Sequence, residues 1–378
     1  MNKFLLTFLF SLFIFCSCKE KITNKFDTDN LELSYKTEYA EGFEIFAFGE
    51  SSIIKIKDLW NNGEDIFYFL SRNNEEAPVD FPGITINIPV SNVVCMSSTY
   101  IAFLETLGYV DIIKGISGGD FISSPDIRQR IKNNDVKDVG YENNINYEIL
   151  VEISPDIVMT YGISGESSLL GPKTEELGLD TFYIGEYLEI TPLGKAEWIM
   201  IFAELIEQKD AAREIFENIK NEYIKYSDLI KEDMHKPTVM LNSPWRDTWF
   251  VPGDKNYMVR LIDDAGGDYV YKGHDSSQSR PISIEDAYVY AVDADFWLNP
   301  GSAATIQELI EDNPKFSNIK SVLSGQVYNN TKRSTPEGGS DFWEAGAVMP
   351  DVILKDIIDI LHPGLIPEHE LYFFSKLE

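Results

Sequence analysis

Residues 210–232 read DAAREIFENIKNEYIKYSDLIKE and lie near the middle of a chain of 378 residues. Their apolar side chains recur at the i, i+3, i+4 and i+7 spacing of an amphipathic helix, and neither Gly nor Pro interrupts the pattern. The apolar positions are Ala212, Ile215, Phe216, Ile219, Tyr223, Tyr226 and Ile230. We expect a continuous helix of roughly 34 Å that Asp210 caps. Such a helix is either a strut between two similar lobes or an ordinary surface helix of one large domain.

The composition is that of a folded, acidic protein. Hydrophobic residues make up 44% of the chain and aromatic residues 13%, which is enough for packed cores, and the length favours two domains. The formal net charge of -30 repels nucleic acid phosphates and anionic lipid headgroups. We therefore expect no nucleic acid partner and no membrane contact other than a lipid anchor.

The first 17 residues have the pattern of a secretory signal peptide. Lys3 precedes the apolar run FLLTFLFSLFIF, which is too short to span a bilayer unaided. Cleavage before Cys18 leaves the small Ser17 at the cut, whereas cleavage before Cys16 would leave a bulky Phe there. We therefore predict a lipoprotein signal peptide in residues 1–17 and a lipid on Cys18. A cleaved signal without a lipid is the alternative.

The segment after the signal peptide is predicted to be a tether in residues 18–35 and a small β-rich extension in residues 36–89. In the extension, short apolar runs alternate with polar turns, as in FEIFAF, SIIKIKDLW, IFYFL and ITINIPV. The dipeptide Asn62-Gly63 is typical of a β-hairpin turn between two of these runs. We expect the extension to be antiparallel.

Strands and helices alternate in residues 90–209 and again in residues 234–378. In the first region the strand VVCMSS is followed by the helical YIAFLETLG and then by the strands DIIKGIS, DIVMTYG and DTFYIG, with helical segments between them. In the second region the strands PTVMLNS, ADFWLNPG and GQVYNN alternate with helices in the same way. This alternation predicts an α/β protein with two parallel, doubly wound lobes joined by a helix in residues 210–233.

The two halves also share a short internal repeat. In the first half Glu148 opens a predicted helix and Asp156 opens the strand that follows it. In the second half Glu285 and Asp295 occupy the same places. The equivalent placement in each half supports two related lobes.

The segments INYEILVEISPDIVMTYG and ISIEDAYVYAVDADFWLNPG, with SSTYIAFLETLG before them, resemble the hallmarks of one protein family. This family is the cluster of periplasmic substrate-binding proteins that serve ABC importers of iron chelates and vitamin B12. The resemblance covers about residues 88–361 and implies two Rossmann-like lobes with parallel sheets, joined by one long α-helix. The β-rich extension departs from the compact members of the family, and its role is open.

The resemblance also implies that one glutamate on each lobe docks onto arginines of a dimeric membrane permease. Glu148 and Glu285 stand at the matching positions. A carboxylate in the first turn of a helix is favoured by the helix dipole and can accept bidentate Arg contacts across an interface. The alternative is that both residues only favour the start of a helix.

The ligand site is expected between the lobes, on loops that follow the carboxyl ends of the strands. Loop aromatics can stack on a flat or apolar ligand, and Arg can pair with a ligand carboxylate or a chelating oxygen. The candidates are Ser98, Thr99, Phe121 and Tyr161 in the first lobe, and Trp245, Arg246, Arg280, Phe342 and Trp343 in the second. For each aromatic residue, packing in the core is the alternative.

The sequence offers little support for a metal site or an active site. The four histidines are His235, His274, His362 and His369. All of them follow the long helix, which excludes a His-rich cage for a naked transition metal between the lobes. Cys95 is predicted to be a buried strand residue. No P-loop, G-x-G-x-x-G or H-E-x-x-H motif occurs, and no carboxylate pair stands out, so we expect neither catalysis nor a resident cofactor.

These features predict a monomeric, lipid-anchored receptor in the cell envelope, periplasmic in a Gram-negative host. It would capture an iron chelate, either a siderophore complex or haem, and deliver it to an ABC permease through both lobes. A cobalamin receptor of the same family is the second interpretation. A cell-envelope interaction lipoprotein without a small-molecule ligand is the third.

Overall fold

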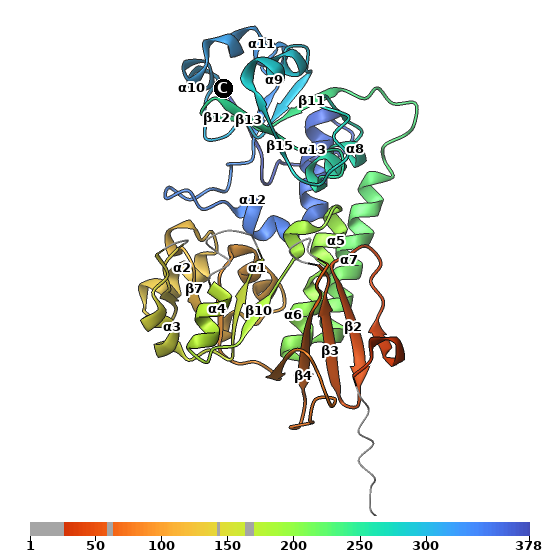
Figure 1. Cartoon of the computed structure of the whole chain (residues 1–378). Coiled ribbons are helices and arrows are strands. Elements are labelled where there is room, and N and C mark those ends of the chain that lie inside the picture. The colour runs from red at the N-terminus through yellow and green to blue at the C-terminus, as the bar shows by residue number, and fades with distance from the viewer. Residues whose placement is uncertain (1–25, 59–62, 142–143, 163–169) are drawn as a thin grey trace, which may run out of the picture.

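The chain folds into two α/β lobes and a β-sheet that packs beside the lower lobe in Figure 1. The structure, a computed structural model, describes residues 26–58, 63–141, 144–162 and 170–378. The first lobe precedes α7 (Lys209–Ser227) and the second follows it. The predicted α/β class with two parallel-sheet lobes is confirmed. None of the described helices is both long enough and apolar enough to cross a membrane.

The first lobe is built on a parallel sheet with strand order β10-β9-β6-β7-β8. Its elements are β6 (Val93–Cys95), α1 (Ser98–Thr106), β7 (Ile113–Ile116), α2 (Pro125–Lys132), β8 (Lys137–Asp138), α3 (Tyr147–Ile153), β9 (Ile157–Thr160), α4 (Leu170–Glu176), β10 (Thr181–Tyr183), α5 (Pro192–Glu197) and α6 (Ile199–Ile206). Polar side chains cap two of the predicted helices: Asn146 accepts a hydrogen bond from the backbone N–H of Ile149, and Thr191 accepts one from that of Gly194. Helix α2 is not predicted from the sequence, because its one buried residue, Ile127, makes no apolar stripe.

The second lobe has a main sheet and a small one. The main sheet, of order β14-β11-β16-β17-β18, is parallel except for β18, and the small sheet, of order β12-β13-β15, is antiparallel. The strands are β11 (Thr238–Leu241), β12 (Pro244–Trp245), β13 (Thr248–Val251), β14 (Asp268–Tyr269), β15 (Arg280–Ser283), β16 (Phe296–Leu298), β17 (Val327–Asn329) and β18 (Ser375–Lys376). The helices are α8 (Tyr257–Asp264), α9 (Ile284–Ala291), α10 (Ile306–Asp312), α11 (Lys320–Leu323), α12 (Asp341–Glu344) and α13 (Pro350–Leu361). The small sheet is not predicted, because its short strands lie among Gly, Asp and Ser residues typical of loops.

The aspartates of the internal repeat have the same role in both lobes. Asp156 precedes β9, and its carboxylate accepts hydrogen bonds from the backbone N–H groups of Ser91 (2.7 Å) and Asn92 (3.0 Å), just before the neighbouring β6. Asp295 precedes β16 and accepts a hydrogen bond from the backbone N–H of Thr238 (2.8 Å), the first residue of the neighbouring β11. Each aspartate ties the starts of two adjacent strands together, which supports two related lobes.

Helix α7 is shorter than predicted at its C-terminal end. It has 19 residues and ends at Ser227, because the backbone N–H groups of Leu229 and Ile230 bond to carbonyls three residues back and form turns. Asp210 lies in the first turn, and the residue at the N-cap offers no side-chain hydrogen bond. The prediction that Asp210 caps the helix is therefore wrong, although its charge suits a helix N-terminus.

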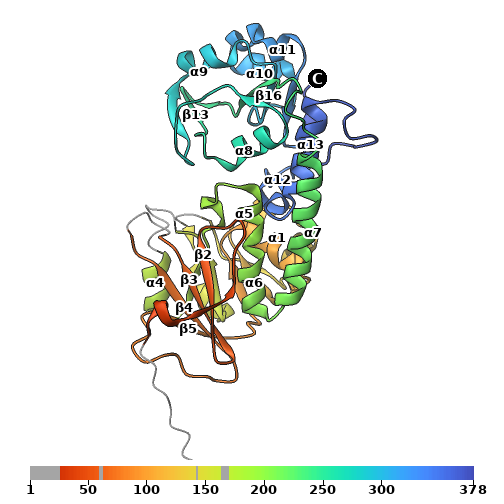
Figure 2. The same ribbon diagram turned by 90° about the vertical axis from the view of Figure 1, so that its right-hand side faces the viewer.

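The apolar face of α7 is shared by both lobes. Ala212 and Phe216 are buried in the core of the first lobe, and Tyr223 is buried in the core of the second. Helices α6 and α13 pack against α7 from the two lobes (Figure 2). The Tyr223 hydroxyl also donates a hydrogen bond of 2.7 Å to Asp264, at the end of α8. Helix α7 is therefore the predicted strut between the lobes.

The N-terminal extension is a five-stranded mixed sheet. Its strands are β1 (Glu32–Tyr35), β2 (Phe43–Phe48), β3 (Ser51–Ile56), β4 (Ile66–Ser71) and β5 (Ile84–Asn87). The sheet is antiparallel as predicted except that β5 runs parallel to β4, because the connection of residues 72–83 is long enough for a crossover. Strand β1 lies inside the segment predicted as a tether, so residues 32–35 belong to the sheet. Asn62 of the predicted turn lies outside the described residues.

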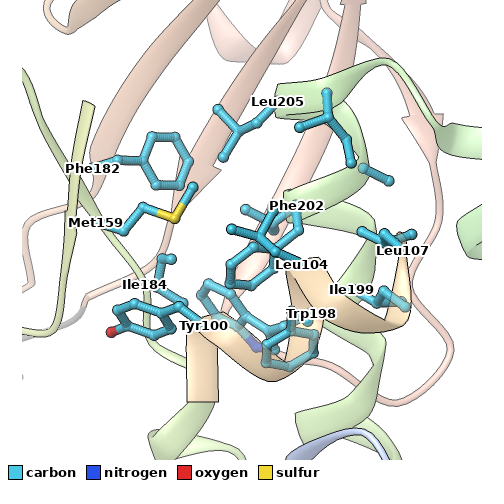
Figure 3. Close-up of a cluster of buried hydrophobic side chains, with 14 of the residues drawn as sticks. Tyr100, Leu104, Leu107, Met159, Phe182, Ile184, Trp198, Ile199, Phe202 and Leu205 are labelled. Carbon is cyan, nitrogen blue, oxygen red and sulfur yellow. The ribbon is translucent and has the colours of Figure 1, made fainter. Parts of the chain in front are cut away.

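The extension shares one hydrophobic core with the first lobe. Figure 3 shows Phe202 of α6 and Phe182 of β10 in the same buried cluster. Tyr68 of β4 stacks on Phe182 with ring centroids 4.2 Å apart, and the ring of Phe43 in β2 lies 5.0 Å from that of Trp198. Because these contacts are buried and continuous, the predicted boundary between extension and lobe is not a packing boundary.

Candidate functional site

The two main sheets change winding direction at their first strands. From β6 the chain passes to β7 on one side and later to β9 on the other, and from β11 it passes to β14 on one side and then to β16 on the other. Open parallel sheets bind ligands beyond the carboxyl ends of the strands at such a switch point. The residues that follow these strands therefore frame the candidate site.

The candidates of the first lobe all follow carboxyl ends of its strands. Ser98 and Thr99 form the first turn of α1 after β6, and the Thr99 hydroxyl donates a hydrogen bond of 2.9 Å to Glu186. Tyr161 follows β9, and Phe121, beyond β7, is 48% exposed. Their positions agree with the prediction, and their contact with a ligand stays a prediction.

In the second lobe, Trp245 and Arg246 form one exposed unit after β11. Trp245 is 63% exposed, and the Arg246 guanidinium lies 4.3 Å from the centre of its ring. A flat aromatic face and a cation are thus presented together. Arg280 lies elsewhere, because it pairs with Val251 at one end of the small sheet while Trp245 pairs with Thr248 at the other. The structure does not bring these three candidates together.

Phe342 is a core residue. It lies in α12 and is 2% exposed, and its ring makes T-shaped contacts with Phe373 and Phe374 at 5.7 and 5.5 Å. The expectation that it lies on a ligand-binding loop is therefore wrong, and packing in the core explains it. Trp343 beside it is 44% exposed and remains a candidate.

Several buried polar atoms without a hydrogen-bond partner lie near the same strand ends. Among the described residues, the Tyr100 hydroxyl, one Glu186 oxygen, the Asn299 side-chain amide and the Asn330 side-chain nitrogen make no hydrogen bond. Tyr100 lies beyond β6, and the other three lie beyond β10, β16 and β17. Unpaired buried polar atoms are uncommon and suit contact with a polar ligand. None of these residues is predicted from the sequence, although a polar residue at the end of a predicted strand is a signal that could have found Asn299 and Asn330.

A cavity of about 670 Å³ lies between the lobes, and we call it the inter-lobe cavity. Its walls come from the extension, from the segment after β10 and from the loop of residues 276–278 in the second lobe. The charged and aromatic residues of its lining are Glu41, Lys57, Asp58, Glu189 and Trp198. The candidates predicted from the sequence are not among the described residues that line it. The cavity is therefore a separate candidate site, with walls from the extension and from both lobes.

Beyond β7, at the other side of the first sheet, the lobes are in direct contact. The chain before α12 reaches over the first lobe (Figure 1). There the Arg128 guanidinium lies 3.0 Å from the Glu337 carboxylate. The two oxygens of Glu344 accept hydrogen bonds from the backbone N–H groups of Ser123 and Ser124, both at 2.8 Å. Glu344 thus holds α12 on the first lobe.

We expect Glu344 to make stability depend on pH. Burial, together with the nearby Asp341 and Glu105 carboxylates, raises the pKa of Glu344 from 4.5 to about 7. The folded protein therefore binds this proton more tightly than the unfolded chain does, and the free energy of unfolding falls by at most ~3 kcal/mol as the pH rises through this window. Glu344→Gln should flatten this fall in urea unfolding at a series of pH values, because the amide does not ionise.

Glu337→Gln is the matched control for this experiment. The pKa of Glu337 is held below its ordinary value by the backbone N–H of Glu337 and by Arg128. Removal of this charge should therefore leave the fall in unfolding free energy between pH 4.5 and 7 as steep as in the wild type. Parallel pH profiles for the wild type and Glu344→Gln would contradict the assignment.

The two predicted docking residues lie on the surface. Glu148 and Glu285 are exposed in the first turns of α3 and α9. Lys315 lies 3.2 Å from Glu285, and the pKa of Glu285 is lowered by its own backbone N–H and by Lys315. A partner arginine at this site would therefore compete with Lys315. Docking itself stays a prediction.

The described part of the chain shows no cluster of three or more His, Cys, Asp or Glu side chains that could hold a metal ion. Cys95 is buried in β6, as predicted, and burial raises the pKa of its thiol. The predicted lipidation site, Cys18, lies outside the described residues.

Two lipoproteins of Methanocaldococcus jannaschii are similar to this chain in sequence. One uncharacterized lipoprotein is 30% identical over 301 residues, which cover 77% of this chain and 70% of that protein. A second uncharacterized lipoprotein is 25% identical over 354 residues, which cover 90% of this chain and 86% of that protein.

Solved structures with a similar fold include two binding proteins with known ligands. A periplasmic haem-binding protein from Pseudomonas aeruginosa superposes with a TM-score of 0.59 at 15% identity, over 76% of this chain and 98% of that one. The triscatecholate siderophore-binding protein of Bacillus subtilis, in complex with ferri-bacillibactin, superposes with a TM-score of 0.55 at 15% identity, over 73% and 94%. At these identities the similarity shows the fold.

The family match covers most of the two lobes. The sequence pattern of the periplasmic binding protein family fits residues 93–333, from the first strand of the first lobe to the segment after β17. The strand order and the long connecting helix agree with that match. The chain therefore belongs to the periplasmic binding protein family, whose members are substrate-binding proteins of ABC transporters.

Proposed function

We propose that this chain is the lipid-anchored receptor of an ABC importer and that it captures a metal chelate between its lobes. The observation that carries the proposal is the inter-lobe cavity of about 670 Å³, whose walls come from both lobes. Small-molecule sites commonly measure about 300–1,000 Å³. Structural neighbours that bind haem or a ferric siderophore support a chelate as the cargo. An iron chelate, siderophore or haem, is the first choice, and cobalamin is the second.

Anchoring and delivery belong to the same proposal. The lipid would be carried by Cys18, in line with relatives named lipoproteins. The permease dimer would be engaged by Glu148 and Glu285, one from each lobe of a monomer. The metal would arrive inside its chelate, so a resident cofactor is not required. Because α7 is held in both cores, we expect small lobe movements on binding.

Tryptophan fluorescence tests this proposal directly. Trp198 lines the inter-lobe cavity. Trp245 in β12 and Trp343 in α12 are exposed. A bound chelate that absorbs near-ultraviolet light should therefore quench the tryptophan emission. The titration uses ferric siderophores, haem and cyanocobalamin, with free ferric ion as the control. We expect saturable quenching by one chelate with a Kd below about 1 µM, confirmed by calorimetry. If no chelate of the panel quenches the fluorescence or gives a heat of binding, the proposal is contradicted, and an interaction lipoprotein without a small ligand is favoured.

A further inference from the structure

The inter-lobe cavity has a charge imbalance. Glu41 and Asp58 bring two carboxylates to its lining, and among the described lining residues Lys57 is the only cation. Glu189 also lines the cavity, but it is buried, and burial raises the pKa of its carboxyl. The Lys57 ammonium lies 3.1 Å from the carboxylate of Glu44, a residue of the extension that does not line the cavity. The positive charge of Lys57 is therefore compensated within the extension. The rest of the lining consists of apolar side chains and of hydroxyl and amide groups. A ligand in this cavity therefore meets a negative wall.

The extension side of the cavity is held in place by hydrogen bonds. The backbone N–H groups of Glu41 and Gly42 donate to the Glu189 carboxylate at 3.0 and 2.9 Å. Gly42 approaches Trp198 so closely that a Cβ at this position would lie 2.8 Å from the indole ring. The Trp198 indole N–H donates a further bond of 2.8 Å to Glu189. This wall is therefore preformed, which lowers the entropic cost of binding.

The opposite wall is also fixed. The backbone N–H of Gly253 donates to the Gln278 carbonyl at 3.2 Å, and that of Lys255 donates to the Ser276 carbonyl at 3.1 Å. The Asn256 side chain donates a hydrogen bond of 2.9 Å to the carbonyl of Ser277. The loop of residues 276–278 is thus tied to the start of α8. Two walls of the cavity therefore come from the extension and from the second lobe. The wall from the extension lies outside residues 93–333, the part of the chain that matches the family.

We infer that the extension is a wall of the ligand site and that it selects a chelate without net negative charge, of the ferric trihydroxamate type. Three hydroxamates neutralise one ferric ion, whereas a ferric triscatecholate is a trianion and haem carries two propionates. Like charges about 4 Å apart repel by about 1 kcal/mol in water and by more where water is partly excluded. The carboxylates of the extension therefore disfavour anionic chelates. This inference rests on the proposed function and names the class of its ligand.

Calorimetry on the full chain in detergent tests the inference with four probes. They are ferrioxamine B, which is a cationic ferric trihydroxamate, ferric enterobactin, which is a triscatecholate, haemin and cyanocobalamin. We expect ferrioxamine B to bind best. The variant Glu41→Gln with Asp58→Asn should weaken its binding by about tenfold, because two favourable charges are lost. The Asn oxygen can still accept the 2.7 Å hydrogen bond that Asp58 receives from the backbone N–H of Gly63, so the fold is preserved.

The matched control is Asp29→Asn with Glu32→Gln, which removes two exposed carboxylates of the extension that do not line the cavity. It should bind ferrioxamine B as the wild type does. Equal affinity of the wild type and the Glu41→Gln with Asp58→Asn variant would overturn the extension as a wall. Preference for enterobactin, haemin or cyanocobalamin would overturn the ligand class. Either result leaves the proposed function standing, whereas no binding of any chelate would remove both.

Discussion

Replacing Glu148 and Glu285 together by alanine should abolish transport and leave ligand affinity unchanged. The two carboxylates are exposed in the first turns of α3 and α9, one on each lobe. Loss of one partner of an interfacial charge pair commonly costs about 2–5 kcal/mol, so loss of both should weaken docking by about 10³-fold or more. Neither residue lines the inter-lobe cavity, so capture of the chelate should not change.

Uptake of a radiolabelled chelate into cells that carry the cognate permease measures this effect, and calorimetry on the purified variant measures capture. The control is Glu175→Ala with Asp312→Ala, which removes one exposed carboxylate from a helix of each lobe. It should transport like the wild type. Uptake at the wild-type rate by the Glu148→Ala with Glu285→Ala variant would refute the docking assignment.

The architecture was predictable because its signals are local. The apolar run after Asn92 became β6, and the run after Asp156 became β9, since buried parallel strands have a short and continuous apolar pattern. The stripe from Ala212 to Tyr223 gave α7, because its period matches a helix that is buried on one face. The end of α7 was misplaced, because Ile230 continues the helical period while its backbone turns towards the second lobe.

The site was less predictable because its contacts are distant in sequence. Glu189 and Glu197 look like ordinary surface carboxylates in an acidic chain, yet both are buried and bind the backbone of the extension. Phe342 follows a Gly-rich segment that is typical of a loop, and the C-terminal residues Phe373 and Phe374 cover it. No local pattern records which distant segment covers a side chain. The inter-lobe cavity, with walls from three parts of the chain, needed the folded structure for the same reason.

Replacing Glu197 by alanine should detach the segment that leads from β1 to the cavity. The Glu197 carboxylate is fully buried in α5 and accepts hydrogen bonds from the Tyr35 hydroxyl (2.7 Å) and from the backbone N–H groups of Glu38 (2.8 Å), Tyr39 (2.8 Å) and Ala40 (2.7 Å). Hydrogen bonds to a charged group contribute about 1.5–3 kcal/mol each, and donors left without an acceptor add a further cost. Because the bonds act together, we expect a loss of about 4 kcal/mol in the free energy of unfolding.

Urea unfolding measures this loss, and amide hydrogen exchange locates it. Protection should fall at Glu38, Tyr39 and Ala40, whose N–H groups lose their acceptor. Glu197→Gln should lie between the wild type and alanine, because its single carbonyl oxygen can still accept some of these bonds. Glu214→Ala, which removes an exposed carboxylate from α7, is the control and should change stability by less than about 0.5 kcal/mol. If Glu197→Ala keeps wild-type stability and wild-type protection at these amides, the extension is held by its hydrophobic contacts, and the carboxylate is not its anchor.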